Sequence, residues 1–464
     1  MKKLWETEPG ALDPRAEAFM SSVSVDKELL EEDLAGSIAH ARMLGERGIV
    51  PKPDAAALVE ALEDMLKAAR SGELKVDESA EDVHSFVEAE LVAHLGPAGK
   101  AVHAGRSRND QVALDLRLYL RAAFLRAEAG VKAAVRALVA LAEPNAETLM
   151  PAYTHMRRAQ PITLAYHLAA WAAALERDAD RFLSARRRAD ECPLGSGAVA
   201  GSGLPLDREA TARALGFARP SRNAMDATAD RDACVDYAAA ASSLFMHLSR
   251  YCEEIILWTG AEYGFMGLKP SCSTGSSIMP QKRNPDVAEL IRGKAGPAFG
   301  ALMALLTMQK GVPLGYARDL QEDKATLFSL VRAVDGALEA FALLVASLEP
   351  KPGAMRAALD SGHAEATDLA ELLVLKGLPF RDAYGAVKAA IAVADQKGAR
   401  LADLSAADFD AASPLFRVAK IDVAALGPWL EPAACVARRS LTGGPAPATV
   451  RAELERLKAF SLTP

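Results

Sequence analysis

The chain has 464 residues, of which 54 are Lys or Arg and 61 are Asp or Glu, giving a formal net charge of −7 at pH 7. Because both signs are spread along the sequence, the concentrated basic face of a nucleic-acid-binding protein is excluded. The longest apolar runs are about half of the ~20 residues that a membrane-spanning helix needs. Five scattered cysteines without a CxxC pair and an N-terminus without the apolar core of a signal peptide predict a cytoplasmic protein.

The pattern of apolar residues predicts helices along almost the whole chain. Half of the residues are apolar but only 6% are aromatic, and Ala and Leu outnumber the β-branched residues that strands prefer. Apolar positions recur at helical spacing, and no run alternates long enough to predict a strand. We therefore expect an all-α fold. The long helices are predicted over residues 107–142, 161–189, 226–260, 284–310 and 320–348.

Length and helix spacing predict three domains. The chain is several times longer than a typical domain, and the segments at both ends have shorter helices separated by Pro and Gly. We expect an N-terminal helical domain over 1–101, a central long-helix bundle over 102–350 that carries the reactive segments, and a small C-terminal helical domain over 351–464. Long single helices are unstable, so their apolar faces must pack together, and several faces are broad enough for packing between subunits.

Four irregular stretches interrupt the helical pattern, and polar, potentially reactive residues concentrate in them. They are residues 102–106, 149–160, 195–206 and 267–284. The last is a hydroxyl-rich loop that ends in Lys282, followed by Asn284 as the predicted helix N-cap and Pro285 as the predicted first helical residue. A helix N-terminus beside a lysine is an anion site, and the alternative is a solvated loop before a well-capped helix. The residue types alone leave both open.

The loop Gly275-Ser276-Ser277-Ile278-Met279-Pro280-Gln281-Lys282-Arg283-Asn284-Pro285 resembles the signature loop of the fumarase/aspartase superfamily. Further motifs, in the same order along the chain, narrow the resemblance to the argininosuccinate lyase family. These motifs are Gly105-Arg106-Ser107-Arg108-Asn109-Asp110-Gln111, Tyr153-Thr154-His155, Arg158-Ala159-Gln160-Pro161, Pro193-Leu194-Gly195-Ser196-Gly197, Met225-Asp226-Ala227-Thr228 and Asp319-Leu320-Gln321-Glu322-Asp323-Lys324. The resemblance extends from about residue 21 to about residue 447.

The resemblance implies a three-domain, all-α homotetramer in which the central helices form a shared helical core. It also implies a lyase that converts argininosuccinate reversibly into arginine and fumarate, the last step of arginine biosynthesis. The reaction removes a weakly acidic proton beside a carboxylate, so the carbanion (aci-carboxylate) intermediate needs fixed donors and cations around it. Neither a cofactor nor a metal is implied, and neither nucleic acid nor membrane is expected as a partner. Each active site is expected to collect residues from several subunits.

The resemblance also assigns the residues of the reaction. Ser276 matches the proton abstractor and His155 the acid that protonates the departing guanidino group, although these two roles are interchangeable at the level of sequence. Glu289 matches the carboxylate that orients the imidazole, and Lys282 the cation that stabilises the intermediate. Positions that match the family's substrate-binding residues are Ser22, Asp26, Asn109, Thr154, Asn284, Tyr316, Gln321 and Lys324. Arg106 and Arg108 are expected to bind substrate carboxylates through their planar guanidinium groups.

Several segments have a plainer alternative. Ser107 to Asp110 also fits a helix capping box, and Gln321 with Lys324 fits a solvated helix face. The stretch Gly195–Gly201 superficially resembles a nucleotide loop, but its spacing is not GxGxxG and no buried strand precedes it. Two alternative functions of the whole chain are also open. It could be a sister lyase that acts on adenylosuccinate, aspartate or malate, or a helical scaffold protein without activity.

The chain departs from the family pattern at a few positions. Glu6 to Gly10 replaces the usual N-terminal arm sequence, Arg157 stands where Gln is common and Ala317 where Asn is common. None of these departures removes a residue that is assigned to the chemistry.

Overall fold

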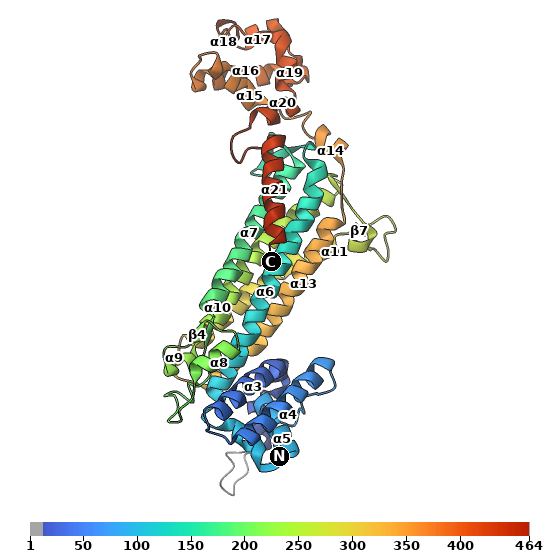
Figure 1. The fold of residues 1–464 in the computed structure, drawn as a ribbon. Coiled ribbons are helices and arrows are strands. Elements are labelled where there is room, and N and C mark those ends of the chain that lie inside the picture. Colours follow the sequence, from blue (N-terminus) through green and yellow to red (C-terminus); the bar gives the residue numbers. More distant parts are fainter. Residues whose placement is uncertain (1–12, 464) are drawn as a thin grey trace. The chain divides into compact units, whose positions relative to one another are not determined.

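The structure is a computed structural model that describes residues 13–463 (Figure 1). The chain forms two compact units. Unit 1 comprises the chain up to Glu128 together with Asp180–Ser243 and Gly296–Asp335, and unit 2 comprises Ala129–Ala179, Leu244–Ala295 and Gly336 to the C-terminus. Helices dominate the described residues, as expected for an all-α fold. The division into three domains stays a prediction.

Five long helices agree closely with the sequence pattern. They are α6 (Arg108–Ala142), α7 (Leu164–Arg188), α10 (Asp232–Thr259), α12 (Ala295–Gln309) and α13 (Asp323–Ala346). Two predicted helices are divided: α9 (Ala224–Ala229) precedes α10, and α11 (Asp286–Gly293) precedes α12. None of the helices in residues 13–463 combines the length and the apolarity needed to span a membrane.

Aromatic side chains pack these helices together within each unit. In unit 1, Phe124 of α6 lies 5.3 Å from Tyr237 of α10 between ring centroids, and Phe182 of α7 lies 5.4 Å from the same ring. In unit 2, Trp171 of α7 stacks on Tyr251 of α10 at 4.9 Å. Such contacts add to the stabilisation from the large apolar area that the rings bury.

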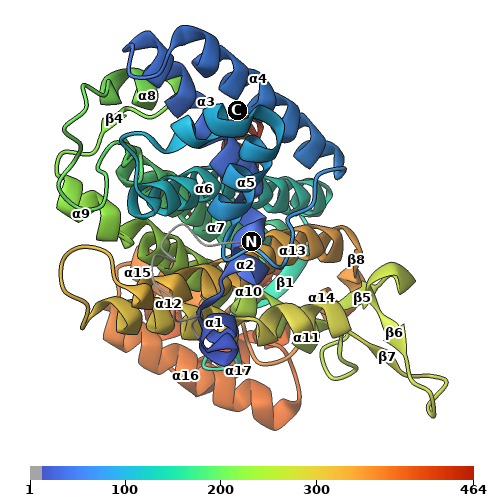
Figure 2. The same cartoon turned by 90° about the horizontal axis from the view of Figure 1, so that it is seen from below.

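Four helices of unit 1 surround a second group of buried apolar residues that includes Leu34, Leu58, Phe86 and Leu91. These helices are α2 (Val23–Asp26), α3 (Leu30–Glu46), α4 (Lys52–Ser71) and α5 (Val83–Leu95). Unit 1 also contains α1 (Pro14–Met20) and α8 (Arg208–Ala214), which lie outside this group. Figure 2 shows α3, α4 and α5 beside the first turns of α6. This arrangement places the irregular segments before α2, α5 and α6 within one unit.

The C-terminal helices of unit 2 enclose their own apolar core, which includes Leu369, Leu373, Val387 and Phe409. The helices after α13 are α14 (Pro352–Ala357), α15 (Ala366–Leu375), α16 (Phe380–Lys397), α17 (Ala406–Ala412), α18 (Leu415–Val418), α19 (Leu426–Leu430), α20 (Pro432–Arg438) and α21 (Pro447–Leu462).

Short strands, which the sequence pattern did not predict, form four two-stranded sheets in the described chain. The pairs are β1 (Leu149–Thr154) with β2 (Arg157–Thr163), β3 (Glu191–Cys192) with β4 (Arg219–Pro220), β5 (Met266–Leu268) with β8 (Leu348–Pro350), and β6 (Thr274–Gly275) with β7 (Arg283–Asn284). Pro151 and Pro161 break the alternation in the longest pair, so stretch 149–160 read as irregular in the sequence.

The predicted N-cap at Asn284 is wrong. Asn284 pairs with Thr274 in the β6–β7 ladder, and α11 begins at Asp286 with Pro285 at its N-cap. The Pro285 ring has no N–H and disfavours helical geometry at the preceding residue, so Asn284 stays extended. Asn284 is therefore the last residue of a hairpin rather than the first of a helix.

Candidate active site

A cavity of about 380 Å³ in unit 1 collects residues from four separate segments of the chain. Seven predicted substrate-binding residues line it: Ser22, Asp26, Arg108, Asn109, Tyr316, Gln321 and Lys324. The other lining residues are Met20, Glu81, Asp82, His84, Val112, Ala317 and Arg318. The fold thus brings together side chains that lie up to three hundred positions apart in the sequence.

Lys324 is the cation of the cavity wall, and acidic groups surround its ammonium. Its Nζ lies 3.0 Å from Asp323 Oδ1 and 3.8 Å from Asp26 Oδ1, and it is only 2% exposed. Burial by itself would lower the pKa of Lys324, but the charges of Asp323 and Asp26 raise it. Lys324 is therefore a charged, buried side chain, and the alternative of a solvated helix face is wrong for it.

A second buried ion pair supports this lysine. Arg231, on the approach to α10, binds Asp323 Oδ2 through its Nε and donates to the Asp230 carbonyl at 2.9 Å. Both Arg231 and Asp323 are almost completely buried. Arg231, Lys324, Asp323 and Asp26 together carry two positive and two negative charges, so the cavity wall is balanced without a ligand.

Asp26 presents an acceptor toward this network. Ser22 donates its hydroxyl hydrogen to Asp26 Oδ2, while Asp26 Oδ1 accepts no hydrogen bond from any described residue. Burial raises the pKa of Asp26, and the nearby charge of Lys324 opposes that increase. A ligand that brings an N–H or ammonium donor to Oδ1 would satisfy this buried acceptor.

Arg108, Arg318 and Gln321 of the cavity lining all bind groups of their own chain. Arg108 pairs with Asp82 Oδ2 at 3.1 Å and donates to Ser85 Oγ at 3.0 Å. Arg318 and Gln321 both donate to the Met20 carbonyl, at 3.1 and 3.2 Å. The predicted ligand Arg108 therefore already has a carboxylate partner within its own chain, and a substrate carboxylate would compete with Asp82.

Arg106 does not line the cavity. Its guanidinium donates to Ser37 Oγ at 2.8 Å, and it faces a buried acidic cluster instead. The structure therefore separates the two arginines that the sequence analysis grouped together, and the role of Arg106 in carboxylate binding stays a prediction.

The acidic cluster consists of Asp33, His84 and Asp115, whose possible metal-ligand atoms all lie within 4.8 Å of one another. His84 Nδ1 lies 3.0 Å from Asp33 Oδ1, and that contact opposes the effect of burial and lowers the pKa of Asp33. Burial and the charge of Asp33 raise the pKa of Asp115 well above its usual range. A metal-binding imidazole nitrogen has to be unprotonated, whereas Nδ1 here serves Asp33 as a donor. We therefore interpret the cluster as a buried pair of His84 and Asp33 beside Asp115 and not as a metal site.

The Asp110 carboxylate binds the backbone of the stretch Gly195–Gly201. Its Oδ2 accepts the backbone N–H groups of Gly195 at 2.9 Å and Gly197 at 2.8 Å. Successive N–H groups in such a loop are the groups that bind phosphates in nucleotide sites. Because the Asp110 carboxylate already occupies them, the resemblance to a nucleotide loop has no functional basis in this fold.

His155 lies at the tip of the β1–β2 hairpin of unit 2, next to Thr154, and both side chains are exposed. His155 and Met156 have φ angles of 52° and 59° between the paired residues Thr154 and Arg157. Two successive positive φ values describe a type I′ turn, for which Asn and Gly are the preferred residues. The hairpin thus holds an imidazole in a backbone conformation that is costly for a non-glycine residue.

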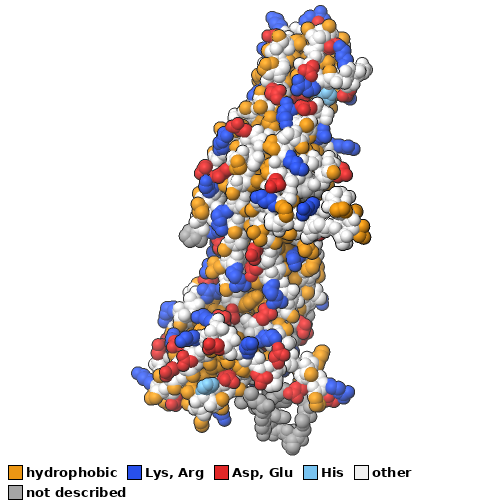
Figure 3. Space-filling view, turned by 90° about the vertical axis from the view of Figure 1, so that its right-hand side faces the viewer, with side chains coloured by type: hydrophobic (Ala, Val, Ile, Leu, Met, Phe, Trp, Pro, Cys, Tyr) orange, Lys and Arg blue, Asp and Glu red, His pale blue; other side chains and the backbone are white. Residues whose placement is uncertain are grey.

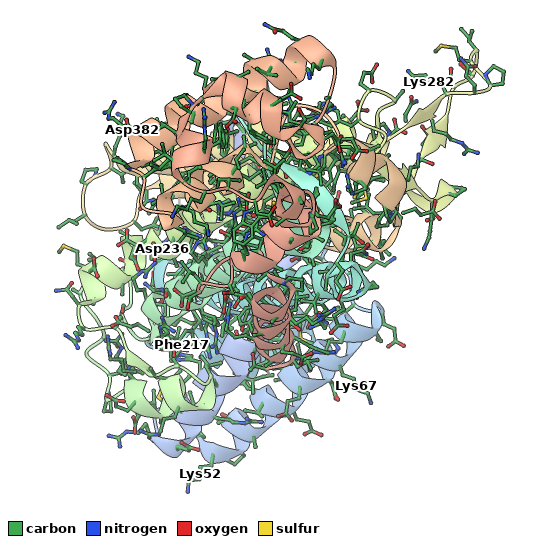
Figure 4. All side chains as sticks on the ribbon, turned by 90° about the horizontal axis from the view of Figure 1, so that it is seen from above. Lys52, Lys67, Phe217, Asp236, Lys282 and Asp382 are labelled. Atoms are coloured by element: carbon green, nitrogen blue, oxygen red, sulfur yellow. The ribbon has the colours of Figure 1, made fainter. Side chains whose placement is uncertain are left out.

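Ser276 and Lys282 belong to the β6–β7 hairpin, also in unit 2. The hairpin projects beyond α11 (Figures 1 and 2), and Lys282 lies near its tip (Figure 4). Ser276 Oγ accepts the backbone N–H groups of Met279 at 3.0 Å and Ile278 at 3.3 Å. Two donors aimed at one hydroxyl oxygen favour negative charge on that oxygen. Ile278 beside it is 85% exposed.

Glu289 lies on the exposed side of α11. Within residues 13–463, no hydrogen bond or ion pair joins any two of His155, Ser276, Lys282 and Glu289. The structure therefore gathers most of the predicted substrate-binding residues in one cavity, and it leaves the predicted proton-transfer residues on the surface of the other unit.

The sequence analysis missed several cavity residues. Glu81 and Asp82 precede α5 and His84 lies in its first turn, and Asp82 caps the helix by accepting the N–H of Ser85 at 2.7 Å. That capping pattern was a signal for a buried helix start. Arg231, which supports Lys324 from outside the cavity lining, carried no local signal at all, because only the fold brings it to Asp323.

Comparisons with known proteins identify the family of the chain. The family model described as "Lyase" matches residues 7–300, and the one described as "Argininosuccinate lyase C-terminal" matches residues 363–437. The argininosuccinate lyase of Desulforamulus reducens is 47% identical over 96% of both chains, and that of Pelotomaculum thermopropionicum is 47% identical over 97% of both. A crystal structure of EDDS lyase in complex with formate superposes with a TM-score of 0.84 at 29% identity, covering 98% of this chain and 91% of that chain. The chain belongs to the argininosuccinate lyase family.

Proposed function

We propose that the chain catalyses the reversible elimination of argininosuccinate to arginine and fumarate, in the cytoplasm, as the last step of arginine biosynthesis. The observation that carries the proposal is the cavity in which seven of the residues matched to substrate-binding positions meet. Relatives of nearly half identity over almost the full length are argininosuccinate lyases, which supports the same substrate.

The cavity suits the amino-acid end of such a substrate. A zwitterionic end has an ammonium group, which complements the open acceptor Asp26 Oδ1, and a carboxylate, which complements Lys324. Because these charges are buried, each contact is stronger than it would be in water. Asn109, Tyr316 and Gln321 add uncharged polar groups around the same space.

The proton transfers are assigned to Ser276 and His155. Ser276 removes the proton, assisted by the N–H groups of Ile278 and Met279 and by the charge of Lys282 once the hairpin excludes water. His155 protonates the departing guanidino nitrogen, and Glu289 orients the imidazole. Lys282 stabilises the aci-carboxylate formed between the two steps. The opposite assignment of Ser276 and His155 is the alternative.

The active form is a homotetramer in which sites are shared between subunits. Phe299, Met303 and Leu306 of α12 are all exposed and lie at helical spacing on one face. Hydrophobic side chains also reach the surface between charged ones on the face drawn in Figure 3. An exposed apolar stripe of this kind favours packing against another chain. Within residues 13–463 the four predicted proton-transfer residues are not bonded to one another, which favours a site completed by a neighbouring subunit.

The direct test adds argininosuccinate to the purified protein and follows fumarate by its ultraviolet absorbance. Adenylosuccinate and aspartate serve as control substrates. Turnover of argininosuccinate alone is expected. Fumarate release from a control substrate, with none from argininosuccinate, would replace the proposal with the sister-lyase function.

Shared sites are tested by mixing two inactive variants, His155→Asn and Ser276→Ala. Asn is well tolerated at positive φ, so the first variant removes the imidazole and keeps the turn. Dissociation and reassembly of the mixture should restore activity in hybrid tetramers, because some sites then receive both intact residues. Each variant carried alone through the same treatment is the control. A mixture that stays inactive would contradict shared sites.

A further inference from the structure

Asp110 follows the predicted substrate-binding residue Asn109 in the sequence, but it does not line the cavity. Its side chain is fully buried. In addition to the two loop N–H groups, its Oδ1 accepts the N–H of Ser107 at 2.9 Å, which is one half of the predicted capping box. One carboxylate therefore ties the start of α6 to the loop that contains Gly195 and Gly197.

The same loop is held from its other side by Arg208. The guanidinium donates to the carbonyls of Leu194 and Ser221, both at 3.1 Å, and to Ser196 Oγ at 3.1 Å. Gly197 has a φ of 61°, and a Cβ there would lie 2.6 Å from the Gly201 carbonyl oxygen. The Asp110 carboxylate binds two N–H groups of the loop, and the Arg208 guanidinium binds the Ser196 hydroxyl and the preceding Leu194 carbonyl, so the loop has little freedom to move.

The loop in turn orients Asn109. Asn109 Nδ2 donates to the Ala198 carbonyl at 3.1 Å. This bond defines which end of the amide is the oxygen and directs the carbonyl group away from the loop. Asn109 lines the cavity, and its amide oxygen can accept a hydrogen bond from a ligand there. The amide keeps this orientation only as long as the Ala198 carbonyl stays in place.

We propose that Asp110 is a positioning residue for substrate binding: by anchoring the Gly195–Ala198 loop to the start of α6, it fixes the orientation of the Asn109 amide in the cavity. The inference rests on the proposed role of Asn109 as a substrate ligand. Only a carboxylate offers acceptors alone to the three N–H groups, because the amide of an Asn would turn a donor toward one of them. A buried N–H that has no partner, or that faces another donor, lowers the stability of the loop and allows it to shift.

The experiment compares steady-state kinetics with argininosuccinate for Asp110→Asn, Asn109→Ala and the double variant. Asp110→Asn should raise KM about tenfold or more, the effect of one lost hydrogen bond to a polar substrate group, with a smaller change in kcat. If Asp110 acts through Asn109, the double variant should be no worse than Asn109→Ala alone. If Asp110→Asn instead weakened the fold in general, the KM increases of the two single variants would multiply in the double variant.

Asp207→Asn is the matched control. Asp207 also accepts a backbone N–H at a helix start, that of Ala210 at 2.9 Å in α8, but it lies outside the cavity lining. Its KM should change by less than about twofold. If Asp110→Asn does not fold, Gly197→Ala displaces the same loop without touching the carboxylate, and it should raise KM with the same lack of additivity.

The outcomes are distinguishable. An unchanged KM in Asp110→Asn, together with a raised KM in Asn109→Ala, would overturn the positioning role and leave the binding role of Asn109 intact. Multiplicative effects in the double variant would also overturn it. An unchanged KM in Asn109→Ala would remove Asn109 from substrate binding and the inference with it.

Discussion

The cavity residues of unit 1 and the hairpin residues of unit 2 differ in how completely their own chain surrounds them. Lys324 is buried between two carboxylates, and Asn109 is bonded to a loop that is itself held on both sides. His155 and Lys282 are exposed on hairpins, and Ser276 bonds only to its own loop. The predicted substrate-binding residues are thus fixed by contacts within one unit, whereas the predicted proton-transfer residues lie on hairpins at the surface of the other.

The difference has a physical reason. A buried ammonium group needs fixed counter-charges in every state of the protein, since desolvation without them is expensive. A residue that transfers protons at a mobile or shared site needs its dry environment only when the substrate is bound. Substitutions in the buried cavity wall should therefore mainly lower stability, and substitutions on the exposed hairpins should mainly change turnover.

Arg231→Met should lower the free energy of unfolding by about 3–5 kcal/mol, because it leaves Asp323 and Asp26 opposite a single cation in a buried site. Urea unfolding measures the change. The matched control is Arg292→Met, which removes the exposed pair with Glu253 in unit 2 and should cost less than about 1 kcal/mol. Equal effects of the two variants would mean that the cavity wall is not held by its buried charges.

Ser276→Ala should lower kcat at least ~10²-fold, the low end for loss of a general acid or base and about 2.7 kcal/mol of activation free energy. The free energy of unfolding should hardly change, because the hydroxyl bonds only to N–H groups of its own loop. Ser277→Ala, on the neighbouring exposed hydroxyl, is the control and should keep normal turnover. Near-normal kcat in Ser276→Ala would remove Ser276 from the chemistry.

His40 offers a pH test of burial in unit 1. Burial, followed by the charge of Arg106, lowers the pKa of His40 to about 3, and its Nε2 lies 2.9 Å from the Ala104 carbonyl oxygen. The unfolded chain binds the proton near pH 6.5. The stabilising contribution of neutral His40 is therefore fully present above pH 6.5 and is lost as the pH falls toward 3, by up to about 1.4 kcal/mol per pH unit.

The measurement is denaturant unfolding between pH 7 and 5, where His40→Gln should show a shallower pH dependence than the natural chain. Gln keeps an N–H donor for the Ala104 carbonyl. Identical slopes in the two proteins would show that His40 is hydrated enough to titrate normally in the folded state, and that this part of unit 1 is less closed than its packing indicates.

Met156→Gly should raise the free energy of unfolding slightly, by about 1 kcal/mol at most, because glycine relieves the positive φ at the hairpin tip and loses some of that gain to chain entropy. Thermal unfolding measures the change. A clear loss of stability would show that the exposed Met156 side chain packs against another chain, so that the hairpin tip is less free than the contrast implies.

Part of this protein was predictable from its residues. The apolar spacing and the cap at Ser107 located α6 to within one residue, because helical periodicity over many turns is a strong local signal. The β1–β2 hairpin was missed because its turn uses His and Met instead of Asn and Gly, and because prolines interrupt its strands. Asn284 was misplaced because the same residue type suits a helix cap and a strand end.

The helical class, the family and the candidate site residues can be predicted from the residues alone, since motifs and periodicity are local properties of the chain. The folded chain was needed to show that Lys324 is buried against Asp323 and Asp26, that Arg231 pairs with Asp323, and that the Asp110 carboxylate binds the N–H groups of Gly195 and Gly197. Charge balance and hydrogen-bond satisfaction in a buried site depend on which distant residues meet, and no local pattern records those meetings.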